Sequence, residues 1–233
     1  MSMLEENLNN AGFALVREAA GSADRLILRA AAEELAVKFP AEAHGLRHLL
    51  ARSPAIRQWV ESGRLRGLIP AGYAVVRSIL FDKNPAANWN VSWHQDLTVA
   101  LRERIETEGF GPWTIKEKVV HAQAPMALLE RMVTVRLHLD RADRDNGALH
   151  VLSGSHAFGK IPESALDAQR QECEEITCEA AAGDALLMRP LLLHSSQKSV
   201  APRHRRVIHL ECAPAGALPE PLQWAERVEI HPA

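Results

Sequence analysis

The sequence predicts a mainly β protein with flanking helices, organised as an antiparallel double sheet or barrel. Helix-forming segments are concentrated in residues 1–70, whereas short apolar or alternating runs follow from Tyr73 onward, with turn residues between them. Many short strands separated by Gly, Pro, Asn and Asp are typical of sandwiches and barrels. With 233 residues, 47% of them hydrophobic, the chain is long enough for one large domain with a buried core.

We expect the whole chain, residues 1–233, to form a single domain. Residues 1–70 are predicted to be a helical wall, residues 71–213 the β core, and residues 214–233 a C-terminal extension. No internal repeat or low-complexity segment suggests a different division.

The N-terminal segment begins with a short apolar strand and continues with helices. Residues 11–16 read as the strand, and Ser22 can cap a helix over residues 23–39 that Pro40 stops. Further on, Ser53 is followed directly by a proline, which is typical of a helix cap with a first-turn proline. Nothing in these helices resembles a functional site, so we expect them to pack outside a sheet.

The β core is expected to begin with a hairpin. Residues 73–81 are apolar and rich in β-branched side chains, and residues 82–87 contain a proline-bearing turn. Residues 88–96 then read as the second strand of the hairpin, and residues 97–101 as a short strand after it.

Residues 102–125 have no clean periodicity and read as a long loop. Long loops in compact domains are usually functional lids or disordered segments. Trp113 and Lys116 are therefore candidates to cover a substrate. An aromatic side chain that pins a loop to the protein surface is an equally common alternative.

The second half of the chain alternates more regularly. Residues 132–140 alternate strictly between apolar and polar side chains, and residues 145–147 (Asp-Asn-Gly) predict a tight hairpin turn. A surface helix is expected over residues 162–175. The last two strands are expected at residues 185–194 and 206–212.

The strand at residues 88–96 carries a polar row. Period-two alternation places one set of side chains on one face and the other set on the opposite face: Asn88, Asn90, Ser92, His94 and Asp96 against Trp89, Val91, Trp93 and Gln95. His94 and Asp96 could together grip an octahedral ion, and one further His would complete the two-His-one-carboxylate triad of non-haem Fe(II) oxygenases. The alternative is a core histidine oriented by a nearby carboxylate.

His194 is the most suggestive candidate for the third ligand. The apolar run at residues 186–193 becomes polar at this position, so the strand meets water or a ligand there. Arg205 stands eleven residues further on, where its guanidinium could hold a small dicarboxylate bidentately. Arg203 and Arg206 are rivals for this role. Neighbours on a strand point in opposite directions, so only one of Arg205 and Arg206 can face the pocket.

Four motifs together resemble the phytanoyl-CoA dioxygenase family, in that family's order and approximate spacing. They are Trp93-His94-Gln95-Asp96, residues 143–149 (Asp-Arg-Asp-Asn-Gly-Ala-Leu), Ser153-Gly154-Ser155-His156, and His194-x-Ser196 with Arg205. Each motif alone is weak, but their combination over residues 73–212 is fairly specific.

The resemblance implies a fold, a cofactor and an activity. It implies a double-stranded β-helix (jelly-roll, cupin-like) core with Fe(II) held by His94, Asp96 and His194. It also implies 2-oxoglutarate as co-substrate, its far carboxylate paired with Arg205 and Ser196. The reaction would consume O2, decarboxylate 2-oxoglutarate to succinate and CO2, and hydroxylate a small-molecule substrate.

The sequence departs from phytanoyl-CoA dioxygenase itself at Arg136, where that enzyme has an aromatic residue. A cationic pocket argues against a fatty acyl-CoA and favours an anionic small molecule as the substrate. The alternative is that Arg136 only pairs with Asp140 or Glu211. Asp96 is retained, whereas halogenating relatives have a small residue there, so the resemblance favours hydroxylation.

Two other functions use the same residues. A non-catalytic, metal-binding jelly-roll module would bind metal without turnover. A zinc hydrolase could use the His-Asp-His set to activate water, but it would leave Ser196 and Arg205 without a role.

The remaining histidines have ordinary expectations. His138, His150 and His209 are expected to be strand residues, and His156 a turn residue or a hydrogen-bonding partner. Arg77 is expected to be exposed or paired; the alternative is that it adds a second positive charge to the pocket.

Composition and charge exclude several partners. The net charge of −2 and the absence of a long basic run argue against nucleic acid. No apolar run is long enough to cross a membrane and no leader segment is evident, so we expect a cytosolic protein. Three cysteines are an odd count and predict free thiols. The sequence does not predict the oligomeric state.

Overall fold

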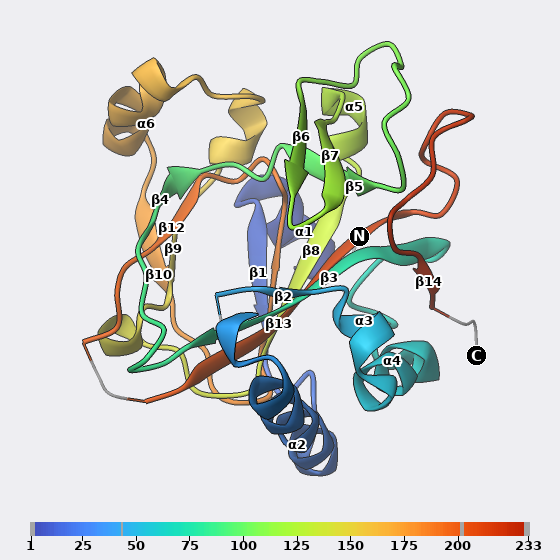
Figure 1. Cartoon of the computed structure of the whole chain (residues 1–233). Helices are drawn as coiled ribbons and strands as arrows, with labels where there is room; N and C mark the ends of the chain where they lie inside the picture. The colour runs from blue at the N-terminus through green and yellow to red at the C-terminus, as the bar shows by residue number, and fades with distance from the viewer. Residues whose placement is uncertain (1–2, 43, 201–202, 231–233) are drawn as a thin grey trace.

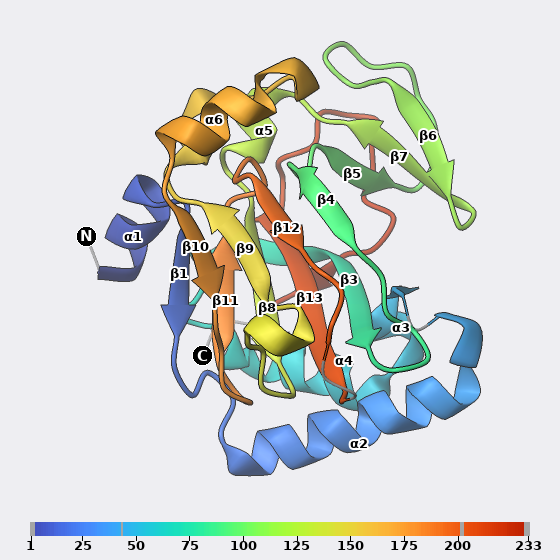
Figure 2. The same ribbon diagram turned by 90° about the vertical axis from the view of Figure 1, so that its left-hand side faces the viewer.

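The computed structural model describes residues 3–42, 44–200 and 203–230 and has two main β-sheets with helices at the periphery (Figure 1). This confirms the predicted mainly β class with flanking helices. Turning the molecule shows the smaller main sheet in front of the larger one, as in a jelly roll (Figure 2).

The larger sheet has seven strands and is antiparallel throughout. Its strands, in spatial order, are β1 (Phe13–Val16), β11 (Ala185–Met188), β8 (Val133–His138), β13 (Arg205–Pro214), β3 (Tyr73–Lys83) and β14 (Val228–Glu229), with β2 (Leu46–Arg47) also paired to β3.

The second sheet has four strands, and a third, smaller sheet has three. The four-stranded sheet runs β10 (Glu175–Cys178), β9 (Leu149–Leu152), β12 (His194–Ser196) and β4 (Val91–His94). The three-stranded sheet runs β5 (Thr98–Leu101), β7 (Val119–Gln123) and β6 (Trp113–Lys116).

The helices of residues 22–59 cover the outer face of the seven-stranded sheet (Figure 1). The α-helices are α1 (Met3–Asn10), α2 (Ser22–Lys38), α3 (Leu49–Arg52), α4 (Pro54–Trp59), α5 (Met126–Leu129) and α6 (Leu166–Glu172). Ser53 caps α4 as predicted, since its Oγ accepts from the Ile56 N–H at 3.3 Å. Ser22 does not cap α2. It is the first helical residue, and Gly21 occupies the cap without a side-chain bond.

None of the helices in the described ranges is both long and apolar enough to span a membrane.

The main hydrophobic core lies between the seven-stranded sheet and the helices. Leu28 and Leu35 of α2 and Ile56 of α4 pack in one cluster with Ile208 and Leu210 of β13. Alternation on β13 therefore sends these apolar residues outward to the helices. The residues between them face the four-stranded sheet, where the candidate site lies.

The predicted hairpin between β3 and β4 is wrong, because the two strands belong to different sheets. β3 pairs with β13, whereas β4 pairs with β12. The connection is a corner held by Asn84, whose Oδ1 accepts from the N–H groups of Ala86 and Ala87 at 2.9 Å each. The corner carries the chain from the larger sheet to the smaller one.

The single strand predicted at residues 185–194 is also wrong. It divides into β11, in the seven-stranded sheet, and β12, in the four-stranded sheet. Pro190 lies at the break and cannot donate a ladder hydrogen bond. The Leu192 N–H bonds the Arg189 carbonyl at 3.1 Å and turns the chain, which brings His194 beside β4.

Residues 102–125 are not the structureless loop that the sequence predicted. They contain β6 and β7, which pair with each other, and β7 also pairs with β5. The alternation in these strands is too short to be distinguished from a loop, and pairing with β5 stabilises them.

The tight hairpin turn predicted at residues 145–147 is replaced by a 3₁₀ turn, Arg144–Asn146. Asp143 caps it by accepting from the Asp145 and Asn146 N–H groups, and the Asn146 side chain accepts from the Asp143 N–H. Gly147 follows with φ 73°, a left-handed conformation that favours glycine. The capping box therefore decides the geometry of this corner.

The expected domain boundaries at residues 70 and 213 stay a prediction. The N-terminal 70 residues do contribute β1 and β2 to the larger sheet, in addition to helices. The thiols of Cys173, Cys178 and Cys212 are free.

Candidate metal centre and anion-binding cavity

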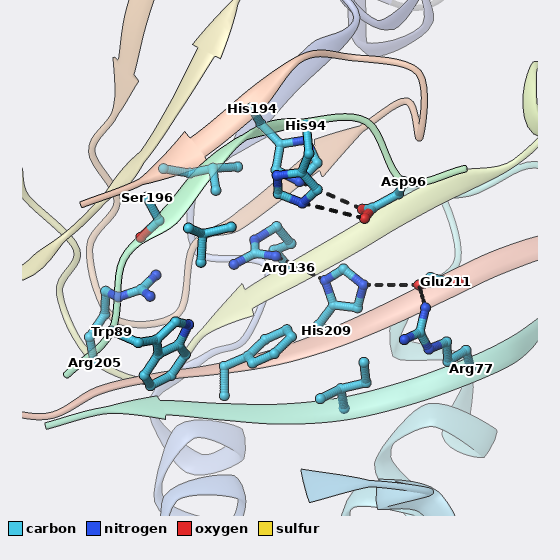
Figure 3. A pocket seen from close by; sticks show the side chains of 14 residues that line it. Arg77, Trp89, His94, Asp96, Arg136, His194, Ser196, Arg205, His209 and Glu211 are labelled. Atoms are coloured by element: carbon cyan, nitrogen blue, oxygen red, sulfur yellow. Dashed lines mark hydrogen bonds and ion pairs between the residues drawn. The ribbon is translucent and has the colours of Figure 1, made fainter. Parts of the chain in front are cut away.

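A cavity of about 110 Å³ lies between the two main sheets and receives side chains from both (Figure 3). Its lining combines a possible metal-binding group with several cations. The labelled residues are Arg77, Trp89, His94, Asp96, Arg136, His194, Ser196, Arg205, His209 and Glu211.

Adjacent strands of the four-stranded sheet bring His94 and His194 together, and Asp96 lies two residues after the end of β4. His94 of β4 is paired directly with His194 of β12. The Nε2 atoms of His94 and His194 lie 3.7 Å from Asp96 Oδ1 and Oδ2, respectively. One ligand atom from each residue lies within 4.8 Å of the others, so the three side chains could hold a metal ion.

The hydrogen bonds of both imidazoles fit a metal-ligating role. His94 Nδ1 lies 2.8 Å from the Ser92 carbonyl, and His194 Nδ1 lies 2.9 Å from the Leu192 carbonyl. A carbonyl only accepts, so each Nδ1 carries the proton. Each Nε2 then presents a lone pair on the Asp96 side, which is how backbone carbonyls orient metal-binding histidines.

The protonation states also suit a cation. Burial lowers the pKa of His194 to about 3, so this imidazole is neutral at pH 7. Burial alone would raise the pKa of Asp96, but His194 and His94 hold it below its ordinary value. A neutral imidazole and an ionised carboxylate are the forms that bind metal.

Strict alternation along residues 88–96 is wrong, because β4 contains a bulge. His94 pairs with His194 and Val91 with Ser196, so three steps on β4 match two on β12. Val91 therefore lines the cavity together with His94, as does Trp89, which the sequence placed on the opposite face. Bulges re-aim side chains in this way and are frequent beside functional sites.

Arg205 lines the cavity and forms no ion pair with a carboxylate among the described residues, although the charge of Asp82 acts on it. It is buried, and its Nε and Nη1 atoms have no hydrogen-bond partner among the described residues. Burial, and then repulsion from Arg136, lower its pKa to about 9. Arg206 points to the outer face instead, where it pairs with Asp140 at 2.8 Å. Arg203 pairs with Asp143 away from the cavity.

Ser196 lies beside Arg205 at one end of the cavity (Figure 3). Its Oγ donates to the Gly147 carbonyl at 2.8 Å and accepts from Lys83 Nζ at 2.9 Å. Sequence reasoning missed Lys83. The sequence did contain a signal for it. Lys83 ends an apolar strand, and residues two and four positions before it, Phe81 and Ile79, lie on the same face and line the cavity.

Arg136 is buried and lines the middle of the cavity. Its Nη1 donates to His209 Nδ1 at 2.9 Å, and the guanidinium lies 5.7 Å from the Phe81 ring centre. Within the described chain it forms no ion pair with either carboxylate considered from the sequence. Asp140 pairs with Arg206, and Glu211 with Arg77 at 2.8 Å.

Sequence reasoning treated His209 as an ordinary strand residue, but it lines the cavity. Because its Nδ1 accepts from Arg136, its Nε2 carries the proton and faces Glu211 Oε1 at 3.4 Å. Burial lowers the pKa of His209, which keeps it neutral. A row of polar contacts therefore runs from the partly buried Arg77 through the buried Glu211 and His209 to Arg136 (Figure 3). Alternation along β13 could have predicted this position, because Arg205, His209 and Glu211 are separated by even numbers of residues and therefore share one face.

Trp113 does not line this cavity. It belongs to β6 and packs against an apolar cluster that includes Val99, Ala122 and Leu129. The pairing of β6 with β7 holds it there, so we leave it out of the proposed site. His156 also lies outside the triad, and its Nε2 bonds the Asn9 carbonyl at 3.1 Å.

A model of one known protein family matches most of the chain. The family model described as phytanoyl-CoA dioxygenase (PhyH) matches residues 9–207. A search of curated proteins found no match.

Solved structures share the fold at low sequence identity, between 15% and 18% for the three described below. The non-heme alpha-ketoglutarate-dependent carbocyclase SnoK from nogalamycin biosynthesis superposes with a TM-score of 0.69 and 15% identity, over 92% of this chain and 85% of that one. HygX from Streptomyces hygroscopicus, with nickel and 2-oxoglutarate bound, superposes with a TM-score of 0.66 and 15% identity, over 93% of this chain and 88% of that one. EctD from S. alaskensis with bound Fe superposes with a TM-score of 0.68 and 18% identity, over 91% of this chain and 76% of that one.

Proposed function

Because the chain belongs to the phytanoyl-CoA dioxygenase family, we propose that it is an Fe(II)- and 2-oxoglutarate-dependent dioxygenase. In this proposal it uses O2 to hydroxylate a small-molecule substrate and converts 2-oxoglutarate to succinate and CO2. We further propose that it acts in the cytosol, where its three free thiols would stay reduced.

The observation that carries the proposal is a buried cation, without an ion pair among the described residues, beside a His-Asp-His group. Burying a guanidinium without a counter-charge is costly, so a site that retains one is built to receive an anion. Arg205 meets that description, and the ligand group of His94, Asp96 and His194 lies in the same cavity. A dicarboxylate that binds metal at one end and a guanidinium at the other fits both features.

Each residue has a proposed task. His94, Asp96 and His194 would hold Fe(II) and leave its other positions open. Arg205 and Ser196 would hold the far carboxylate of 2-oxoglutarate and so orient its other end toward the metal. The bound metal would supply the activation of O2 and the oxidation. The structures of HygX with nickel and 2-oxoglutarate, and of EctD with Fe, support the choice of a metal ion and 2-oxoglutarate as the bound groups.

Hydroxylation is the proposed outcome because Asp96 occupies a position where halogenating relatives have a small residue. The similar fold of a carbocyclase makes the product the deciding measurement. A hydroxylase adds one oxygen atom to its substrate, whereas ring closure removes two hydrogen atoms. Mass spectrometry of the product distinguishes these outcomes.

The function can be tested with anaerobic protein. Adding Fe(II) and then 2-oxoglutarate is expected to produce a visible charge-transfer band, and subsequent O2 is expected to yield succinate. A non-catalytic metal-binding module would bind Fe(II) without forming succinate. A zinc hydrolase would show neither the band nor succinate.

We propose an anionic substrate on the strength of Arg136. 2-Oxoglutarate would place one carboxylate at the metal and the other at Arg205, which leaves Arg136 without a counter-charge. An anionic group on the substrate would supply that charge in a buried setting, where charge-assisted bonds are strong.

Replacing Arg136 is therefore expected to change substrate selectivity. Arg136→Gln should lower kcat/KM for an anionic substrate by about 100-fold, the effect of losing one buried charge-assisted contact. Arg136→Lys retains the charge and is the matched control. Succinate formation across a panel of anionic and neutral metabolites measures the effect. An unchanged preference in Arg136→Gln would contradict the assignment.

A further inference from the structure

Lys83 is a completely buried lysine at the end of β3 and is the cross-strand partner of Arg205. Its Nζ donates to Ser196 Oγ at 2.9 Å and to the Gln197 carbonyl at 2.5 Å. The same nitrogen lies 5.3 Å from the Trp89 ring centre. Lys83 therefore lies directly behind the end of the cavity that Ser196 and Arg205 line.

Among the described residues, two cations act on Lys83, Arg205 of β13 and Arg136 of β8. Asp82 is adjacent in sequence but points to the other side of the strand, where it contacts His204 and Asn84. Lys83 forms no ion pair with a carboxylate anywhere in residues 3–42, 44–200 and 203–230. A buried ammonium in this position needs an anion from outside the chain.

The backbone around Lys83 is shaped to admit it. A Cβ atom on Gly147 would lie 2.9 Å from Lys83 Nζ and 2.4 Å from the Gln197 carbonyl oxygen. Gly147 also offers the carbonyl that Ser196 Oγ bonds. The glycine thus permits a compact arrangement in which lysine, serine and two backbone carbonyls meet beside Arg205.

We propose that Lys83 belongs to the co-substrate site as a positioning residue. It fixes Ser196 beside Arg205 and brings a second positive charge to the far carboxylate of 2-oxoglutarate, taking up a proton from solvent as that carboxylate binds. This inference rests on the proposed function and extends it to how the protein compensates the charge of its co-substrate.

Electrostatics support the proton uptake. Burial, followed by repulsion from Arg205 and Arg136, lowers the pKa of Lys83 to about 7. About half of the free protein then carries neutral Lys83 at pH 7, and about nine-tenths at pH 8. A carboxylate between these cations favours the protonated form and raises the pKa. The affinity for 2-oxoglutarate should therefore be constant below pH 7 and fall by up to about tenfold per pH unit above it.

Calorimetry can count the protons. 2-Oxoglutarate is titrated into anaerobic, Fe(II)-loaded protein in two buffers that differ in ionisation enthalpy. About 0.9 proton per site should be taken up at pH 8 and about 0.5 at pH 7. Uptake of no proton at pH 8 would overturn the role of Lys83. Because this measurement uses the unaltered protein, it remains decisive even if a variant does not fold.

Variants then assign the proton. Lys83→Met should abolish the proton uptake and remove the pH dependence of 2-oxoglutarate affinity. Lys83→Arg should also remove the pH dependence, because arginine keeps its positive charge over the whole pH range. Lys38→Met, at an exposed position in the last turn of α2, is the control and should change neither. His138 and His209 are buried, neutral alternatives near the same arginines. Uptake that persists in Lys83→Met would assign the proton to them and overturn the proposal.

The outcomes separate this inference from the proposed function. If 2-oxoglutarate does not bind the Fe(II)-loaded protein at all, both fail. If it binds, gives the charge-transfer band and yields succinate, but takes up no proton that depends on Lys83, only the inference about Lys83 fails.

Discussion

His194→Ala is expected to abolish turnover and to weaken Fe(II) binding by at least about 100-fold. Removing one of three protein ligands costs more than removing an outer partner of a ligand, which typically costs 10–100-fold in metal affinity. His194 also supplies a preset geometry, because its Nδ1–H bonds the Leu192 carbonyl and its Nε2 faces Asp96. No other side chain of β12 can replace that nitrogen.

Metal content after dialysis and direct Fe(II) titration measure this effect. His150→Ala is the matched control, because His150 lies in the same sheet and its Nδ1 contacts Glu175 away from the cavity. The control should retain metal. A His194→Ala protein with full metal occupancy would show that the metal, if any, binds elsewhere.

Arg205→Ala is expected to raise the KM for 2-oxoglutarate by about 100- to 1000-fold while leaving Fe(II) binding intact. Truncating one partner of a buried charge pair typically costs 2–5 kcal/mol, about 30- to 4000-fold in affinity, and the expected change lies inside that range. Arg136 and Lys83 retain positive charge nearby, but neither offers a bidentate guanidinium in that position. The loss should therefore appear in co-substrate affinity before it appears in kcat.

The neighbouring arginine provides the control for this prediction. Arg206 points away from the cavity and pairs with Asp140 and Glu33, so Arg206→Ala should lower thermal stability without raising the KM for 2-oxoglutarate. Steady-state succinate formation and Fe(II) titration test both variants. If Arg205→Ala weakened Fe(II) binding as much as it raised the KM for 2-oxoglutarate, the assignment of Arg205 to the co-substrate would be contradicted.

Local patterns in the sequence predicted much of what lies within single strands. Alternation in β8 and β13 separates inward from outward residues, which is why only one of Arg205 and Arg206 reaches the cavity. The motifs predicted that His94, Asp96 and His194 would be neighbours, and the structure brings them together. Their roles as ligands stay a prediction until metal binding is measured.

Features that depend on the packing of distant segments could not be predicted. The bulge in β4 depends on its register against β12, and the separation of β11 from β12 depends on a corner at Pro190. Lys83 and His209 looked like ordinary strand residues. Their importance depends on which charged groups lie across the sheet, and single-strand periodicity does not contain that information.

The proposed ligands of the metal and the arginines of the cavity stand on opposite walls of the molecule. His94 and His194 belong to the four-stranded sheet, whereas Arg136 and Arg205 belong to the seven-stranded sheet. In the proposed function the co-substrate spans the gap between these walls, and an apolar cluster that contains Val151 of β9 and Met188 of β11 lies between the same two sheets. Val151 is the cross-strand partner of His194, so we expect a change in the volume of that packing to change the length of dicarboxylate that the proposed site accepts.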